Sequence, residues 1–260
     1  MRRRHALSAA FLSLLSCTAT AAPVAIINAG FEDPYNGGDV PVGNFPVGPA
    51  PNGWTIHDPD GIVGPQVFVG VLNPGTSADY PAGAEVFFPG GAAEGDNAAL
   101  LFADGRDARP AYGIEQTLDA ALAPNTRYSL RVAVGNIASG TGLGASAGFG
   151  YANLDGFPGY QVQLRAGDTL LAMDDSSLLP GEGLFAESEV SFTTGALHAA
   201  LGQALTIRLI SLNGAGGPIA RGIEVDFDDV RLDATAVPLP AGIGLLAAGL
   251  GMLGLRRRRD

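Results

Sequence analysis

The stretch from Arg127 to Val134 reads Arg-Tyr-Ser-Leu-Arg-Val-Ala-Val, and it decides the fold class. Successive side chains of an extended chain point to opposite faces, so a strand that is buried on one side alternates apolar and polar residues. Here Tyr128, Leu130 and Val132 share one face with Val134, and the residues between them lie on the other face. The stretch therefore predicts a β-strand with one face in a hydrophobic core.

The rest of the chain repeats this kind of segment. Short runs rich in β-branched, aromatic and leucine residues are separated by clusters of Gly and Pro, and no long segment has the period of an amphipathic helix. Gly167 and Asp168, between two such runs, predict a tight hairpin turn, and the Gly- and Ala-rich segment 138–159 predicts a long loop. Strands are expected at residues 24–28, 53–57, 66–71, 85–88, 97–103, 113–118, 128–135, 160–166, 169–173, 189–194, 204–212 and 223–233. Eleven or twelve short strands without helices between them favour an all-β, two-sheet jelly-roll sandwich.

The charges are distributed unevenly. All fifteen basic residues are arginines, and seven of them lie at residues 2–4 and 256–259. Residues 22–240 keep the other eight arginines against twenty-five of the twenty-six acidic residues, a net charge of about −17. A body this acidic is not expected to bind nucleic acid or anionic lipid. The single cysteine, Cys17, lies outside this body, so no disulfide is expected and stability must come from a packed core.

The N-terminus has the layout of a secretory signal peptide. An arginine cluster and an apolar stretch precede small residues that end at Ala21. Cleavage after Ala21 satisfies the Ala-x-Ala rule through Ala19, which predicts a helical signal peptide over residues 1–21. The alternative is a lipoprotein, because a Leu-Leu-Ser-Cys sequence ends at Cys17, which would then carry the lipid.

The C-terminus has three parts in a fixed order. A Val-Pro-Leu-Pro-Ala motif is followed by an uncharged apolar run at 242–255 and by four arginines. As a helix this run would be roughly 22 Å long, short of the ~30 Å hydrocarbon core, but the motif and snorkelling arginines would let it cross. The sequence thus predicts a single transmembrane helix. The motif consists of Val237, Pro238, Leu239, Pro240 and Ala241, and the basic cluster of Arg256, Arg257, Arg258 and Arg259.

This tail resembles the PEP-CTERM class of bacterial sorting signals, in the variant whose motif reads VPLPA. The resemblance implies an exosortase-type membrane protease as a partner and export through the inner membrane of a Gram-negative bacterium. The protein would reach the cell surface or the extracellular space after transient anchoring. The alternative is an ordinary C-terminal membrane anchor. The predicted organisation is a signal peptide at 1–21, a β-sandwich at 22–236 and a sorting signal at 237–260.

Two motifs stand near the ends of the predicted sandwich. Residues 28–34 read Asn-Ala-Gly-Phe-Glu-Asp-Pro, and residues 225–232 read Val-Asp-Phe-Asp-Asp-Val-Arg-Leu. Together with Gly53-Trp54 between them, they resemble the galactose-binding-like jelly rolls of carbohydrate-binding modules. In those modules the first strand carries an Asn-x-x-Phe-Glu stretch and the last carries an Asp-Asp-Val stretch. The resemblance implies a jelly-roll fold and a polysaccharide partner.

The same resemblance implies a structural Ca²⁺ ion, held by the glutamate of the first motif and an aspartate of the last. On this chain these residues are Glu32 and Asp228, with Asp229 as a substitute. Carboxylates and loop carbonyls supply the six to eight oxygens that Ca²⁺ takes. The alternative is that Glu32 is an acid in a turn and that the aspartates solvate an edge strand.

No residue of the body is predicted to be catalytic. The body has no Gly-x-Ser-x-Gly elbow, zinc-type His spacing or phosphate loop, and His57 and His198 are its only histidines. The His57–Asp60 cluster could be a second cation or catalytic cluster, or a polar turn. Trp54, the only tryptophan, is expected in the core rather than at a sugar site.

The sequence thus predicts an exported protein of the cell surface or extracellular matrix that binds carbohydrate and is not an enzyme. Two alternatives stay open. One is an extracellular glycan hydrolase, which would need two carboxylates about 5–10 Å apart in one cleft. The other is a purely structural or adhesive matrix protein.

Overall fold

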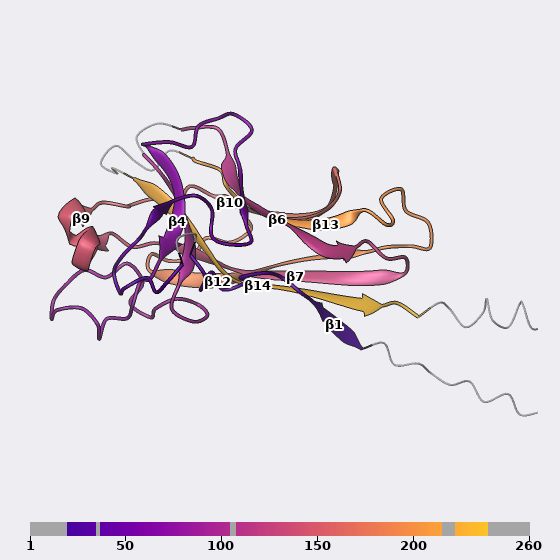
Figure 1. The fold of residues 1–260 in the computed structure, drawn as a ribbon, viewed down its shortest axis with the longest axis horizontal. Helices are drawn as coiled ribbons and strands as arrows, with labels where there is room; N and C mark the ends of the chain where they lie inside the picture. Colours follow the sequence, from indigo (N-terminus) through magenta and orange to yellow (C-terminus); the bar gives the residue numbers. More distant parts are fainter. Residues whose placement is uncertain (1–19, 35–36, 105–107, 215–221, 239–260) are drawn as a thin grey trace, which may run out of the picture.

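The computed structural model describes residues 20–34, 37–104, 108–214 and 222–238. These residues form two antiparallel sheets that face each other (Figure 1), so the prediction of an all-β sandwich is confirmed. The helix found in the described residues is the 3-10 helix η1 (Gly144–Phe149). Within these residues, no helix is long and apolar enough to cross a membrane. Residues 1–19 of the predicted signal helix, the apolar C-terminal run and the arginine cluster lie outside the described residues, so the signal peptide and the transmembrane helix stay predictions. Ala21, the last residue of the predicted signal helix, begins β1.

The larger sheet, called sheet A, has seven strands, and the other, called sheet B, has five. Sheet A contains β1 (Ala21–Val24), β2 (Val47–Gly48), β4 (Val67–Leu72), β5 (Ala98–Ala103), β7 (Thr126–Asn136), β12 (Leu184–Thr193) and β14 (Ile223–Ala236). Sheet B contains β3 (Thr55–His57), β6 (Tyr112–Ala121), β10 (Tyr160–Ala166), β11 (Thr169–Asp175) and β13 (Ala204–Ser211). A small hairpin joins β8 (Gly140–Thr141) to β9 (Tyr151–Ala152).

Sheet A has the order β12-β7-β14-β5-β4-β2, with β1 paired to β14, and sheet B has the order β11-β10-β13-β6-β3. The last strand, β14, therefore lies in the middle of sheet A, between β7 and β5. The alternative that the aspartates of the last motif lie on an edge strand is therefore wrong, because β14 is a central strand.

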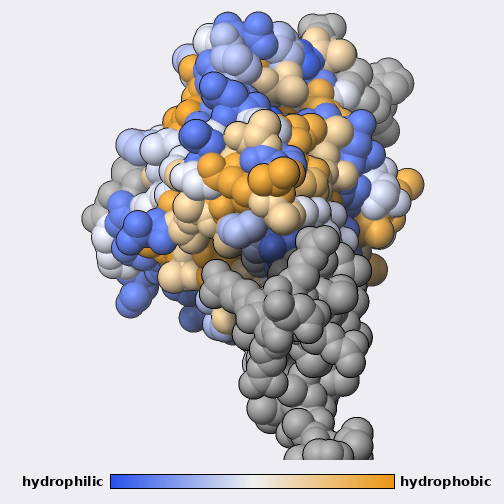
Figure 2. All heavy atoms as spheres, turned by 90° about the vertical axis from the view of Figure 1, so that its right-hand side faces the viewer, coloured by the Kyte–Doolittle hydropathy of each residue, from blue (hydrophilic) through white to orange (hydrophobic). Residues whose placement is uncertain are grey.

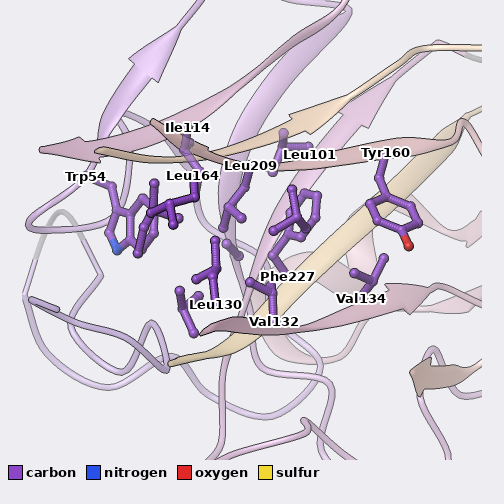
Figure 3. Packing of buried hydrophobic residues seen from close by; sticks show 14 of the residues in the cluster. Trp54, Leu101, Ile114, Leu130, Val132, Val134, Tyr160, Leu164, Leu209 and Phe227 are labelled. Atoms are coloured by element: carbon purple, nitrogen blue, oxygen red, sulfur yellow. The ribbon is translucent and has the colours of Figure 1, made fainter. Parts of the chain in front are cut away.

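The main core lies between the two sheets (Figure 3). The predicted inward face of β7 is there, since Leu130, Val132 and Val134 are fully buried. Trp54 is also buried, with its ring centroid 5.3 Å from that of Phe31 and its indole N–H donating to the Asn28 carbonyl oxygen. Trp54 is thus a core residue, as expected.

A second apolar cluster covers the opposite face of sheet A. It is built from Leu72 and Leu100 of the sheet together with residues of covering loops. The loop residues are Phe87, Phe88, Ile137 and Leu154. At β4 and β5, sheet A is therefore buried on both faces, one against sheet B and one beneath loops.

Three sequence predictions need correction. The first strand ends at Val24 instead of running over 24–28, because the chain turns at Asn28, whose side chain bonds to the backbone of Asp33 and whose φ is 53°. The segment 85–88 is not a strand, since its consecutive residues Phe87 and Phe88 are both buried in the same cluster, whereas a strand would point them to opposite faces. The segment 138–159 is not a plain loop but contains β8, η1 and β9.

The two ends of the domain lie side by side. β1 pairs with the end of β14, with Ala21 opposite Thr235, and both strands lead away from the covering loops (Figure 1). Figure 2 looks at this end and shows a group of apolar side chains among polar ones. The loops over sheet A gather at the other end, where the site described next lies.

Candidate functional site

Three side chains form a row across sheet A on the face that points away from sheet B. The strand register places Phe68 of β4 opposite Phe102 of β5, and Phe102 opposite Glu224 of β14. The rings of Phe68 and Phe102 are stacked, with centroids 4.5 Å apart and planes 16° apart. The residues before and after each of the three in the sequence belong to the core between the sheets. Because successive side chains of a strand point to opposite faces, the three side chains of this row point away from sheet B.

The row lies at the base of a cavity of about 570 Å³. This volume suits a small organic molecule. Five phenylalanines line the cavity, and its other lining residues are aliphatic, glycine or proline except for Glu224. The phenylalanines are Phe45, Phe68, Phe87, Phe102 and Phe149. The cavity is therefore an apolar chamber with one carboxyl group.

Local features hold the walls in place. Both oxygens of Asp58 accept backbone N–H groups, from Ile62 and Val63, at 2.9 Å each, which fixes the turn that leads into the wall at 63–65. The polar turn of this structure is thus the segment 58–60, and His57 is the last residue of β3. On another wall, a Cβ at Gly70 would lie 2.4 Å from the Pro46 carbonyl oxygen, so glycine lets the 46–48 segment approach β4.

The mouth of the cavity is formed by η1 and the strand β9. The hydroxyl oxygen of Ser146 accepts from the Phe45 N–H at 3.3 Å, and the Ser146 N–H donates to Asn44 Oδ1 at 3.2 Å, so η1 is tied to the opposite wall. Phe149 ends η1 with 76% of its surface exposed, and its ring centroid is 5.3 Å from that of Phe45. Exposed aromatic surface thus borders the entrance.

Glu224 is the chemically distinctive residue of the cavity. It is 5% exposed, and burial raises its pKa to about 8, while a hydrogen bond with Asp226 lowers the pKa somewhat. The raised pKa keeps the carboxyl group protonated at neutral pH. A neutral carboxylic acid in an apolar chamber can donate a proton or a hydrogen bond to a bound molecule.

Asp226 lies two residues along β14 from Glu224, on the same face of the strand. It is fully buried, and neither of its oxygens accepts a hydrogen bond from any residue that the structure describes. Burial and the nearby Glu224 raise its pKa well above the usual range. Since two adjacent buried carboxylates would repel each other, the pair retains a proton at neutral pH.

Tyr112 of β6 supports the row from the core side. Its hydroxyl group donates to the carbonyl oxygens of Phe68 at 3.2 Å and Phe102 at 2.8 Å. Burial raises the pKa of Tyr112 well above its usual range, so the hydroxyl keeps the proton that it donates. Sheet B is thereby tied directly to the backbone of the two stacked phenylalanines.

The predicted calcium residues Glu32 and Asp228 bind the same loop. Glu32 Oε1 accepts the N–H groups of Asp96 and Asn97 at 2.8 and 2.9 Å, and Asp228 Oδ2 accepts the N–H of Glu94 at 2.7 Å. The structure thus brings two residues together that are distant in sequence. Within the described ranges, however, no three His, Cys, Asp or Glu side chains are grouped closely enough to hold a metal ion.

Asp229, the predicted substitute, points elsewhere. Its carboxylate pairs with Arg231 at 3.0 Å, and its backbone N–H donates to Asp228 Oδ1 at 2.7 Å. A positive φ of 47° turns the chain at this residue. The first two of the sorting-motif residues, Val237 and Pro238, follow the end of β14, and the other three lie outside the described residues.

Comparisons with known proteins identify the family. The model of the HpiC1-like family, described as HpiC1 cyclase, matches residues 22–233. The chain belongs to the HpiC1-like cyclase family. No curated protein sequence is similar enough to this chain to count as a relative.

Solved cyclase structures from Fischerella are similar to this family member over nearly their whole length. An apo cyclase from Fischerella sp. is 35% identical, with 84% of this chain and 98% of that chain covered and a TM-score of 0.67. A Stig cyclase from Fischerella sp. TAU, in complex with (3Z)-3-(1-methyl-2-pyrrolidinylidene)-3H-indole, is 36% identical, with 84% and 100% covered and a TM-score of 0.67. A cyclase from Fischerella sp. TAU, in complex with 4-(1H-indol-3-yl)butan-2-one, has the same identity and coverage and a TM-score of 0.66.

Membership of this family corrects the functional predictions. The prediction of a non-catalytic, carbohydrate-binding surface protein is wrong, because the family and the similar structures are cyclases. The predicted partners, an exosortase and a polysaccharide, are likewise wrong, because the similar structures bind small indole compounds. The physical reason is that loops cover the outer face of β4, β5 and the first part of β14 and enclose a chamber, which no local pattern of the sequence indicates.

The sequence interpretation missed Glu224 and the phenylalanines that line the cavity. One signal was present: residues 223–228 read Ile-Glu-Val-Asp-Phe-Asp, with acids at every second position of a predicted strand. Apolar residues on the alternate positions bury one face, but only the loops, distant in sequence, bury the other. Of these acids, only the aspartates were therefore interpreted, as calcium ligands or as solvated side chains, and Glu224 was given no role.

Proposed function

We propose that this protein cyclises a small, apolar, unsaturated substrate that carries an indole ring, with Glu224 as the proton donor. The observation that carries this proposal is the single carboxyl group in the apolar cavity, which a pKa of about 8 keeps protonated at neutral pH. The indole ring is inferred from the compounds bound in the two similar Fischerella structures. Family membership supports the cyclase activity.

The chemistry needs only the groups present in the cavity. Glu224 transfers its proton to an electron-rich double bond, whose π electrons form the new C–H bond and leave a positive charge on the other carbon. A second double bond of the same molecule attacks that carbon and forms a C–C bond. Loss of a proton to the Glu224 carboxylate then gives the cyclic product and restores the acid. Substrate and product are isomers, so no oxidant or reductant takes part.

The surroundings of Glu224 suit this role. A general acid works best when its pKa lies near the working pH, and burial brings Glu224 to that range. The apolar lining keeps water from the cationic intermediate, which water would otherwise capture as an alcohol.

The proposal is tested by incubating the protein with 3-substituted indoles that carry diene side chains, in D₂O. Liquid chromatography with mass spectrometry should detect a cyclic isomer with one deuterium bound to carbon. Glu224→Gln, which keeps the shape but has no acidic proton, should lower the rate by roughly 10²–10⁴-fold.

The matched control is Glu189→Gln, which removes a carboxylate from the exposed side of β12, where Glu189 pairs with Arg131. This variant should cyclise at the wild-type rate. Full activity of folded Glu224→Gln, or an isomer without deuterium, would show that Glu224 is not the proton donor.

We further propose that a Ca²⁺ ion binds beside Gly30, between the carboxylates of Glu94 and Asp228. A Cβ at Gly30 would lie 2.1 Å from Glu94 Oε2 and 3.8 Å from Asp228 Oδ1, so the absence of a side chain there lets two acidic oxygens approach one point. Burial raises the pKa of Asp228 to about 7, with a further contribution from the charge of Glu94. A cation would relieve both effects.

Nearby groups favour a cation at this place. Asn97 is buried, and its Oδ1 atom has no hydrogen-bond partner in the described part of the chain, while its Nδ2 donates to Glu32 at 2.9 Å. Carboxylate and amide oxygens are ligands that Ca²⁺ accepts. As in the jelly rolls that the sequence resembles, the ion would join the first motif to the last strand, a structural role outside the cavity.

A further inference from the structure

The five phenylalanines line the same cavity as the Glu224 carboxyl group. Phe102 is the direct cross-strand neighbour of Glu224, and the ring of Phe68 is stacked on that of Phe102. Directly opposed residues on neighbouring strands have Cβ atoms about 4.5–5.5 Å apart. The first of the rings is therefore adjacent to the acid.

The other three rings also line the cavity and lie near one another. The ring of Phe45 is at an edge-on 80° to that of Phe87, with centroids 6.2 Å apart, and is 5.3 Å from that of Phe149. All five are phenylalanines, and no tyrosine, tryptophan or histidine is among the residues that line the cavity. The lining thus offers aromatic rings without competing hydroxyl or N–H groups.

The choice of phenylalanine has an electrostatic consequence. The face of a benzene ring is negative, so it attracts a cation within about 6 Å of its centroid, and more strongly where water is excluded. Leucine or isoleucine would fill the same walls and exclude water equally well, but would not stabilise a positive charge.

We infer that Phe45, Phe68, Phe87, Phe102 and Phe149, together called the phenylalanine cage, bind the cationic intermediate of the reaction. The inference rests on the proposed function, since the cation arises when Glu224 protonates the substrate. Phe102 and Phe68 stabilise the charge where it forms, and the Glu224 carboxylate left in the same row balances it. The cage neither gives nor takes a proton. The substrate class is thereby narrowed to unsaturated molecules that react through a carbocation or an iminium ion.

The test compares two ligands of the same shape that differ in charge. They are 2-(indol-3-yl)ethyltrimethylammonium and 3-(3,3-dimethylbutyl)indole, whose quaternary nitrogen and quaternary carbon occupy equivalent positions. Isothermal titration calorimetry is carried out on the Glu224→Gln protein, so that attraction to a carboxylate at this position plays no part. The measured quantity is the affinity for the cation divided by the affinity for the neutral ligand.

Phe102→Leu, added to this protein, should lower that ratio about tenfold, because it removes the ring face and keeps an apolar side chain. The matched control is Leu72→Ala, which also removes volume from the cavity lining but no ring, and should weaken both ligands alike. If Phe102→Leu does not fold, pentafluorophenylalanine at position 102 keeps the shape and removes the negative face, and it should lower the ratio at least as much.

The outcomes separate this inference from the proposed function. An unchanged ratio in both Phe102 variants would overturn the cage, whether or not Glu224 proves to be the acid. A reduced ratio supports the cage even if folded Glu224→Gln still cyclises, a result that would instead remove Glu224 as the proton donor.

Discussion

Over residues 223–228 the two faces of β14 are both buried, yet they have opposite chemistry. Val225 and Phe227 point toward sheet B and belong to the main core. Glu224, Asp226 and Asp228 point the other way, and they are at most 5% exposed. One strand therefore separates an apolar interior from an interior that contains three carboxyl groups.

This difference teaches where the protein is built for stability and where for chemistry. Burial of an apolar side chain contributes favourable free energy, whereas burial of an unpaired carboxylate is costly, and the group responds by a raised pKa. Such shifts gather at functional sites. We expect substitutions on the inner face to affect mainly stability and substitutions on the outer face to affect mainly function.

The largest effect on stability is expected on the inner face. Phe227→Ala should lower the free energy of unfolding by about 3–5 kcal/mol, because it leaves a cavity in a fully buried cluster. Urea unfolding measures the change. On the outer face, Asp226→Leu should stay within about 1 kcal/mol of the wild type, because it replaces a buried carboxyl group by an apolar one. Equal losses in the two variants would show that the faces do not differ in this way.

The pH dependence of stability should identify the outer face directly. The pKa of Glu224 is about 8 in the folded protein against a usual value of 4.5, so between these values only the folded state holds the proton. Its contribution to stability is full below pH 4.5 and is lost as the pH rises through 8. From pH 5 to pH 8, with chelator present, the wild type should lose roughly 3 kcal/mol more than Glu224→Gln. Parallel curves for the two proteins would contradict a raised pKa at Glu224.

Removal of calcium should lower the stability of the protein through Asp228, the buried acid of β14 that is farthest along the strand from Glu224. At a free Ca²⁺ concentration 100 times its dissociation constant, binding stabilises the folded state by roughly 2.7 kcal/mol. Chelator should therefore lower the melting temperature of the wild type and have no effect on Asp228→Asn. The matched control is Asp229→Asn, which should respond to chelator as the wild type does, because Asp229 pairs with Arg231. A response to chelator in Asp228→Asn would place the ion elsewhere.

The smallest effect is expected where the two faces are connected. Tyr112→Phe removes the hydroxyl group that donates to Phe68 and Phe102 and should cost about 1 kcal/mol of stability. Because the same bonds position the two phenylalanines, the Michaelis constant for the proposed indole substrate should rise while the pH profile of the rate stays unchanged. A shifted pH profile would indicate that Tyr112 acts on Glu224 and not on the rings.

Much of the fold could be predicted from the chain because it depends on local pattern. The alternation over residues 128–134 places that strand in the core, and Gly167 with Asp168 forms the two-residue turn between β10 and β11. The segment 85–88 was predicted wrongly because its apolar run resembles a strand. Its two phenylalanines instead pack on the covered face of sheet A.

The sequence by itself determined the strand periodicity, the acidic and cystine-free character of the body and the burial of Trp54, because each follows from residue type and near neighbours. Only the tertiary structure decided that β14 lies at the centre of sheet A and that loops from three parts of the chain close over it. The pKa of Glu224 and its contact with the phenylalanine cage depend on that closure. Burial by residues that are distant in sequence leaves no local pattern. For this reason the burial of Glu224 in an enclosed chamber could not be predicted from the sequence.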